Sequence, residues 1–167
     1  MPPYAVSVPY SMEPQARPNW CWAATAKSTS VFYLPSSSWT QCTVANGALE
    51  RSDCCDSGYY VACDVPWHLD SALMVTDNFV SMTGPLTNEQ VIAELQAGRP
   101  LGARVAWSGG GGHFVVIYGY SFIMQVPRFT IADPIYGVQG TPTWSFANNY
   151  MGSGTWTHSY YTKANGP

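Results

Sequence analysis

The stretch over residues 15–30 constrains the fold of this chain more than any other. An irregular lead-in ends at Asn19, and a run rich in Ala and Thr begins at Cys21. Asn19 is a suitable N-cap, because its side chain can accept a hydrogen bond from an N–H that the first helical turn leaves unpaired. A helix over residues 20–33 then has Cys21 in its first turn, where the positive end of the helix dipole favours a thiolate. The sequence therefore predicts a reactive cysteine at the start of a helix.

The other cysteines are Cys42, Cys54, Cys55 and Cys63. A bond between the neighbours Cys54 and Cys55 would be strained, so we expect Cys42 to pair with one of them and Cys63 with the other. Each disulfide would stabilise the fold by about 2–4 kcal/mol and would indicate an oxidising compartment. A zinc site built from these four thiolates is the rival interpretation. It is disfavoured because the sequence contains no Cys-x-x-Cys pair, and we expect no metal.

The composition is typical of a compact globular protein. The chain has 167 residues, of which 46% are hydrophobic and 10% are charged, whereas disorder requires the reverse balance. We expect one domain over residues 1–167, and a monomer. A net charge of −3 with scattered arginines argues against a nucleic-acid-binding protein, because no basic stripe exists to neutralise phosphates.

The sequence has no apolar run of the roughly 18 residues that a membrane span requires. Its N-terminus also lacks the basic and apolar regions of a signal peptide. Because the cysteines indicate an oxidising compartment, we expect a secreted or periplasmic protein whose signal or pro-segment precedes this sequence.

The order of the expected elements favours an α+β fold, with a helical part over about residues 15–98 and an antiparallel sheet over about residues 100–165. Thr87 and Gln90 form a capping-box signature at the start of one helix. Helices are expected at 20–33, 40–49, 67–74, 88–97 and 145–150, and strands at 101–107, 113–121, 126–132 and 155–162.

Two residues of the predicted sheet are candidates to assist Cys21. His113 follows four glycines and begins one strand, and Asp133 ends the next strand. If these strands are antiparallel neighbours, the start of one lies beside the end of the other, so His113 and Asp133 should be adjacent. A cysteine nucleophile needs a base, and the base needs a partner that fixes its ring. Gln15 is near enough along the chain to offer its amide as an oxyanion donor.

These motifs together resemble the papain-like cysteine peptidases: Gln15, then Cys-Trp-Ala at Cys21, a later Gly-His at His113 and a later Asp-Pro at Asp133. The form Asn-Trp-Cys-Trp-Ala-Ala is most similar to the bacterial branch that contains bacteriocin-leader peptidases and plant-pathogen effector proteases. The resemblance implies a helical lobe and a sheet lobe with the active site in the cleft between them. It also implies a protein or peptide substrate and no cofactor.

The cysteine endopeptidase is the leading interpretation, with Cys21, His113 and Asp133 as the triad. Transglutaminase or glutamine deamidase activity could use the same acyl-thioester chemistry, and a non-catalytic binding module is the alternative from another class. His68 and His158 are poor candidates for the base, because nothing in the sequence links them to Cys21. The residues expected to flank the substrate are Trp20, Trp22, Trp107, Gly111 and Gly112.

Overall fold

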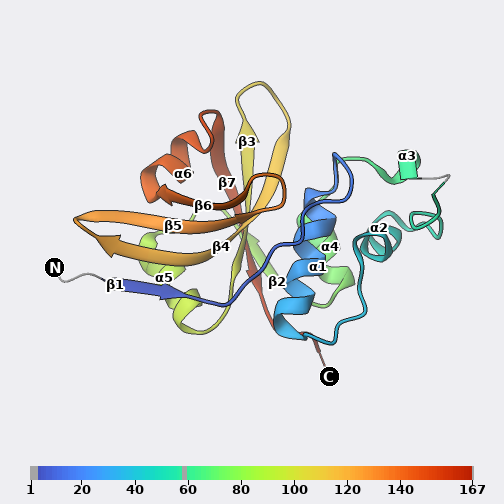
Figure 1. Cartoon of the computed structure of the whole chain (residues 1–167), viewed down its shortest axis with the longest axis horizontal. Helices are drawn as coiled ribbons and strands as arrows, with labels where there is room; N and C mark the ends of the chain where they lie inside the picture. Colours follow the sequence, from blue (N-terminus) through green and yellow to red (C-terminus); the bar gives the residue numbers. More distant parts are fainter. Residues whose placement is uncertain (1–3, 58–59, 167) are drawn as a thin grey trace.

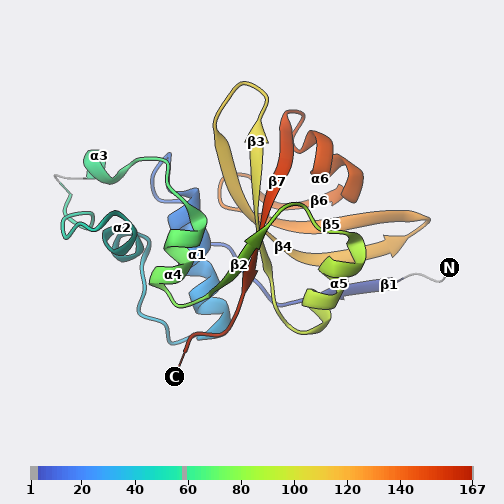
Figure 2. The same ribbon diagram turned by 180° about the vertical axis from the view of Figure 1, so that it is seen from behind.

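The structure, a computed structural model, describes residues 4–57 and 60–166. A group of helices stands beside an antiparallel sheet, and helix α1 lies where the two parts meet (Figure 1). Seen from behind, the same division holds, and α5 and α6 lie on the sheet side (Figure 2). The helices are α1 (Cys21–Tyr33), α2 (Gln41–Leu49), α3 (Tyr60–Cys63), α4 (Leu69–Val75), α5 (Asn88–Gln96) and α6 (Thr143–Asn149).

The sheet has seven strands in the order β2-β7-β3-β4-β5-β6, and β1 pairs with β4 beside this path. Every pairing is antiparallel, so the predicted α+β class is confirmed. The long strand β4 pairs with β3 over its first half and with β1 over its second half. The strands are β1 (Tyr4–Ser7), β2 (Phe79–Thr83), β3 (Leu101–Trp107), β4 (Gly112–Ile123), β5 (Val126–Asp133), β6 (Gly137–Pro142) and β7 (Gly154–Thr162).

The two edge strands, β2 and β6, were not among the strands expected from the sequence. Most of β2 is exposed, so its side chains do not alternate between apolar and polar in the way that marks a half-buried strand. β6 contains two glycines and Pro142, which are depleted in strands but tolerated at a sheet edge.

The helical part is also shorter than expected, because α5 packs against strands of the sheet. Its capping box is confirmed: Thr87 and Gln90 each bond to the other's backbone N–H. Val91 and Leu95 on this helix are buried in the core of the sheet part. Helix α5 therefore packs with the sheet part, although the sequence placed it in the helical part that was expected to end near residue 98.

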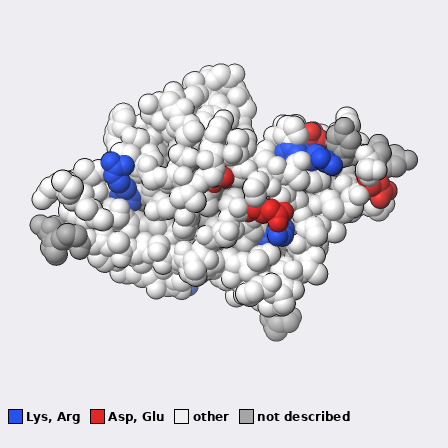
Figure 3. Space-filling view, in the orientation of Figure 1, with Lys and Arg blue, Asp and Glu red and all other residues white. Residues whose placement is uncertain are grey.

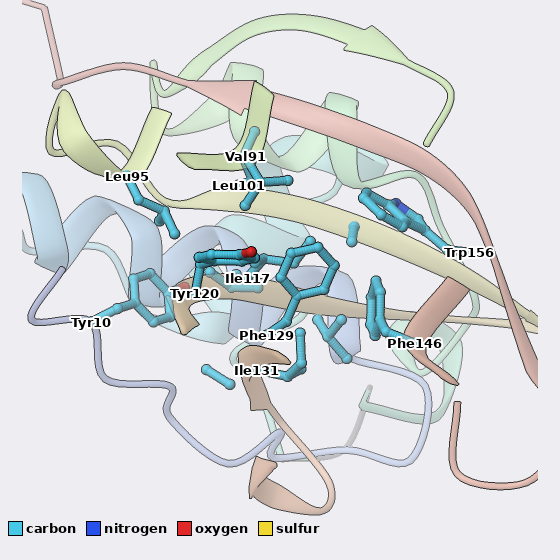
Figure 4. Packing of buried hydrophobic residues seen from close by; sticks show 14 of the residues in the cluster. Tyr10, Val91, Leu95, Leu101, Ile117, Tyr120, Phe129, Ile131, Phe146 and Trp156 are labelled. Carbon is cyan, nitrogen blue, oxygen red and sulfur yellow. The ribbon is translucent and has the colours of Figure 1, made fainter. Parts of the chain in front are cut away.

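Strand β3 separates two apolar clusters. Leu101, Ala103 and Val105 point into the core of the sheet part, where aromatic rings from β4, β5, α6 and β7 pack together (Figure 4). Since successive side chains of a strand point to opposite faces, Gly102 and Arg104 face the helical group. A second cluster on that side joins α1 and α4 to β4 and β7; its members include Trp22, Leu69, Leu73, Phe114 and Tyr160.

The longest helix, α1, has 13 residues, and no described helix has the length and apolarity that crossing a membrane requires. On the face shown in Figure 3, charged side chains are few and separated, with no basic stripe.

Candidate active site

Cys21 lies in the first turn of α1, as predicted, and is its first residue, but the helix lacks the expected cap. The N-cap residue is Trp20, whose side chain makes no capping hydrogen bond. Asn19 instead binds Asp64: its backbone N–H donates to Asp64 Oδ1 at 2.9 Å, and its side chain donates to the Asp64 carbonyl at 3.2 Å. The expected Asn19 cap is therefore wrong. As a result, no capping side chain covers the N–H groups of the first turn, which have no partner within the helix.

Three consecutive residues, Cys63 to Val65, hold the start of α1. The hydrogen bonds between Asn19 and Asp64 fix the backbone two residues before Cys21. The indole N–H of Trp20 donates to the Cys63 carbonyl at 2.8 Å, and that of Trp22 donates to the Val65 carbonyl at 2.9 Å. Trp20 is buried and does not line the cleft, which departs from its expected role beside the substrate. It anchors Cys21 instead.

Two disulfides stabilise the helical group, and one of them reaches this segment. Cys42 is bonded to Cys55, and Cys54 is bonded to Cys63, which is one of the two pairings that the sequence left open. The sulfur atoms of Cys54 and Cys63 and a carboxylate oxygen of Asp53 lie within 4.8 Å of one another, and atoms of these kinds can bind a metal ion. Because these four cysteines form two disulfides, they cannot bind zinc as thiolates. Cys21 is the free cysteine among the described residues.

His113 lies at the start of β4, directly after the tight turn from β3. Gly110 and Gly111 in this turn have φ values of 103° and 82°, a region that favours glycine. The His113 side chain is 3% exposed, and its Nε2 lies 2.9 Å from Asp133 Oδ1 at the end of β5. The adjacency predicted from the two antiparallel strands is present.

Asp133 accepts hydrogen bonds at both carboxylate oxygens. Oδ1 also accepts from the backbone N–H groups of Ile135 at 2.8 Å and Tyr136 at 3.0 Å. Oδ2 accepts from the buried hydroxyl of Tyr150 at 2.7 Å. The sequence does not point to Tyr150, because its position just after α6 carries no motif. Its hydroxyl completes a chain that runs from Tyr150 through Asp133 to His113.

The partners of His113 control its charge. Burial alone would lower the pKa of His113, but hydrogen bonds with Asp133 and Cys21 raise it to about 9. Burial alone would raise the pKa of Asp133, but hydrogen bonds from His113, Tyr150 and the backbone hold it below its ordinary value. At neutral pH the ring is therefore an imidazolium between a carboxylate and the sulfur of Cys21.

Trp107, at the end of β3, covers this chain of hydrogen bonds with its indole ring. It stacks on His113 with ring centroids 5.7 Å apart and an interplanar angle of 22°. It also stacks on Tyr150, at 6.3 Å and 17°. A ring in this place limits the access of water to the bond between His113 and Asp133, which strengthens that bond.

Cys21 and His113 line the same cleft, which has a volume of about 770 Å³ and lies between the helical group and the sheet. Four of the five residues expected to flank a substrate are part of its wall: Trp22, Trp107, Gly111 and Gly112. The wall also contains residues that sequence analysis did not select, including Asp70, Arg104 and Tyr160, and the two histidines set aside as bases, His68 and His158.

Gln15 lies in the loop before α1 but does not line this cleft. Its backbone N–H donates to the Pro134 carbonyl at 3.0 Å, which ties the loop to the residue after Asp133. Its side-chain Nε2 donates to the carbonyls of Arg17 at 3.0 Å and Pro18 at 2.8 Å. Its role as an oxyanion donor stays a prediction.

Comparison with family models matches residues 3–151 to the family described as papain-like cysteine protease AvrRpt2. The chain belongs to this family. The matched range includes Cys21, His113 and Asp133, whereas His158 and Tyr160 of the cleft wall lie beyond it. No curated protein sequence matches the chain.

Solved structures give the same fold for this protease. A putative C39-like peptidase from Bacillus anthracis has a TM-score of 0.58 at 16% identity, covering 98% of this chain and 100% of that one. Digestive procathepsin L 3 from the Tenebrio molitor larval midgut has a TM-score of 0.57 at 13% identity, covering 95% of this chain and 69% of that one. The predicted papain-like fold is confirmed, and the protein is a cysteine protease of the hydrolase class.

Proposed function

We propose that this protease is an endopeptidase that cleaves protein or peptide substrates through Cys21, His113 and Asp133. One observation carries the proposal: the His113 ring bonds to Asp133 on one side and faces the Cys21 sulfur on the other, in an open cleft. This is the arrangement that nucleophilic catalysis by cysteine requires, with a base beside the sulfur and a partner that orients the base.

The reaction follows from these positions. Cys21 attacks the peptide carbonyl carbon as a thiolate, with His113 as its imidazolium partner, and a carbon–sulfur bond forms. His113 then gives its proton to the leaving amine as the carbon–nitrogen bond breaks. The now neutral His113 removes a proton from water, which attacks the thioester and releases the carboxylic acid and the Cys21 sulfur. Asp133 fixes the His113 ring throughout.

The oxyanion of each tetrahedral intermediate needs hydrogen-bond donors. The backbone N–H of Cys21 is one, because it lies in the uncapped first turn of α1. The Gln15 amide is the second, provided that it exchanges one of its present carbonyl partners for the substrate. Gln15→Ala should therefore lower kcat by about 10²–10³-fold in steady-state assays.

The two disulfides suggest an oxidising environment, which supports a secreted or periplasmic protease. We infer a single catalytic domain, because each of the three proposed catalytic residues comes from the same chain. That it acts as a monomer stays a prediction.

The test is incubation of the protein with an unfolded protein substrate, followed by mass spectrometry of the products and an assay for ammonia. Endopeptidase activity predicts new peptide termini that are lost in Cys21→Ala, while circular dichroism shows that this variant keeps its fold. Ammonia release without new termini would instead indicate glutamine deamidation by the same sulfur. Full activity in Cys21→Ala would refute the proposed nucleophile.

A further inference from the structure

Arg104 brings a permanent positive charge into the cleft. Its neighbours in the strand, Ala103 and Val105, are buried in the core of the sheet part, so Arg104 points the other way, toward the helical group. Among the described residues that line the cleft, Arg104 is the only arginine or lysine. Asp70 on α4 is the only residue of this lining that carries a carboxylate. A half-buried guanidinium is costly to place, so its position calls for a reason.

The guanidinium lies against Gly112, the residue immediately before His113. A Cβ atom at this position would lie 2.7 Å from Arg104 Nη2 and 2.9 Å from Cζ, so a side chain here would displace the guanidinium from its present place. Gly112 is not among the glycines with positive φ, so its backbone does not require glycine. With glycine here, the guanidinium can lie beside the residue that precedes the proposed catalytic histidine.

Arg104 has donors to spare for a ligand. Its Nη1 donates to Thr157 Oγ1 at 3.0 Å, and the Thr157 hydroxyl lies 3.2 Å from the Arg104 carbonyl. A guanidinium carries five N–H donors in a planar fork that matches a carboxylate. No carboxylate among the described residues forms an ion pair with Arg104.

Asp70 is near but does not neutralise this charge. Burial raises the pKa of Tyr160 to about 12, with Asp70 adding to the rise and Arg104 opposing it, so both charges act on the same hydroxyl. Asp70 belongs to the helical group and Arg104 to the sheet, and the two do not form an ion pair. The cleft therefore has a cationic wall on the sheet side, next to His113.

We propose that Arg104 binds the carboxylate of an Asp or Glu side chain in the substrate, at a fixed position relative to the scissile bond. This inference rests on the proposed endopeptidase function and names its substrate class: peptides with an acidic residue close to the bond that is cut. The planar guanidinium binds that carboxylate through two N–H groups, while Thr157 and the surface of Gly112 hold the guanidinium in place.

The test is a positional-scanning library of acetylated, amidated peptides, with cleavage followed by mass spectrometry. At one position, Asp or Glu should raise kcat/KM by about 10- to 100-fold over Asn or Gln, the range expected for a hydrogen-bonded ion pair. Because the amidated peptides have no terminal carboxylate, any preference for a carboxylate must come from a side chain. If cleavage required a free C-terminal carboxylate, the inference would be overturned.

Substitutions then assign the preference to the guanidinium. Arg104→Gln should abolish it, Arg104→Lys should keep a reduced part of it, and Arg104→Glu should favour Lys or Arg at the same position. Arg128→Gln is the matched control, because Arg128 is exposed on β5, and it should leave the preference unchanged. Equal cleavage of Asp and Asn peptides by the wild type, or an unchanged preference in Arg104→Gln, would overturn the inference.

A binding measurement separates this inference from the proposed function. Calorimetry on Cys21→Ala, with peptide pools that differ only in Asp or Asn, should show tighter binding of the Asp pool, and adding Arg104→Gln should remove the difference. If the wild type cleaves no peptide, the endopeptidase proposal fails, but these titrations still decide on Arg104. Equal or undetectable binding of both pools would overturn it.

Discussion

Tyr150 extends the hydrogen-bonded chain of the active site by one side chain beyond Asp133. Asp133 is almost completely buried, and a buried carboxylate is costly unless its oxygens are hydrogen-bonded. The Tyr150 hydroxyl donates to Oδ2, and burial together with Asp133 raises the pKa of Tyr150, so the hydroxyl stays protonated and keeps donating. Tyr150 thus fixes Asp133, and through it the ring of His113.

Tyr150→Phe removes this donor while keeping the ring that stacks on Trp107. We expect the free energy of unfolding to fall by about 1.5–3 kcal/mol, because a buried charged acceptor loses a partner. We also expect kcat to fall about tenfold with little change in KM, since Tyr150 does not line the cleft. Tyr161→Phe, on β7 beside Leu101, is the control and should change neither the free energy of unfolding nor kcat. A change in KM alone would contradict a positioning role.

The pKa of His113 predicts the alkaline limit of activity. It lies at about 9, above the ordinary value of 6.5, so the interactions that favour the imidazolium are complete below about pH 6.5 and are lost as the pH rises through about 9. The basic limb of kcat/KM against pH should therefore lie near pH 9. Asp133→Asn removes the main stabilising charge and should move this limb to lower pH. An unchanged limb would show that Asp133 does not act on His113.

At the scale of elements, the active site depends on a short segment that contributes no catalytic group. The main-chain carbonyls of Cys63 and Val65 and the side chain of Asp64 hold the residues on either side of Cys21. The Cys54–Cys63 disulfide ties this segment to the loop after α2. The disulfides therefore bear on the position of the sulfur nucleophile as well as on the stability of the fold.

The double variant Cys54→Ala/Cys63→Ala tests this link. We expect the free energy of unfolding to fall by about 2–4 kcal/mol in denaturant titrations. Activity should also fall under conditions where the variant is still folded, because the start of α1 loses its anchor. Cys42→Ala/Cys55→Ala removes the other disulfide, which does not include the anchoring segment. It should lose similar stability but less activity, and equal loss of activity in both variants would contradict the link.

At the scale of the whole molecule, the cleft forms because α1 packs on the sheet and carries Cys21 to His113. The sequence predicted this arrangement correctly in outline, since the start of α1 and the two antiparallel strands follow from local patterns and from strand pairing. It could not predict β2 or β6, because edge strands need little burial and leave little apolar pattern. The roles of Asn19, Tyr150 and Arg104 depend on partners far along the chain, which no local pattern specifies.

If His113 and Asp133 activate Cys21, the sulfur of Cys21 should be alkylated quickly even at mildly acidic pH. Intact protein at about pH 6 is treated with iodoacetamide and mapped by mass spectrometry, a pH at which an ordinary thiol is almost unreactive. Cys21 alone should be alkylated rapidly, with the four disulfide-bonded cysteines protected, and His113→Ala should slow the reaction strongly. Slow labelling of Cys21 in the wild type, or the same rate in His113→Ala, would contradict this activation.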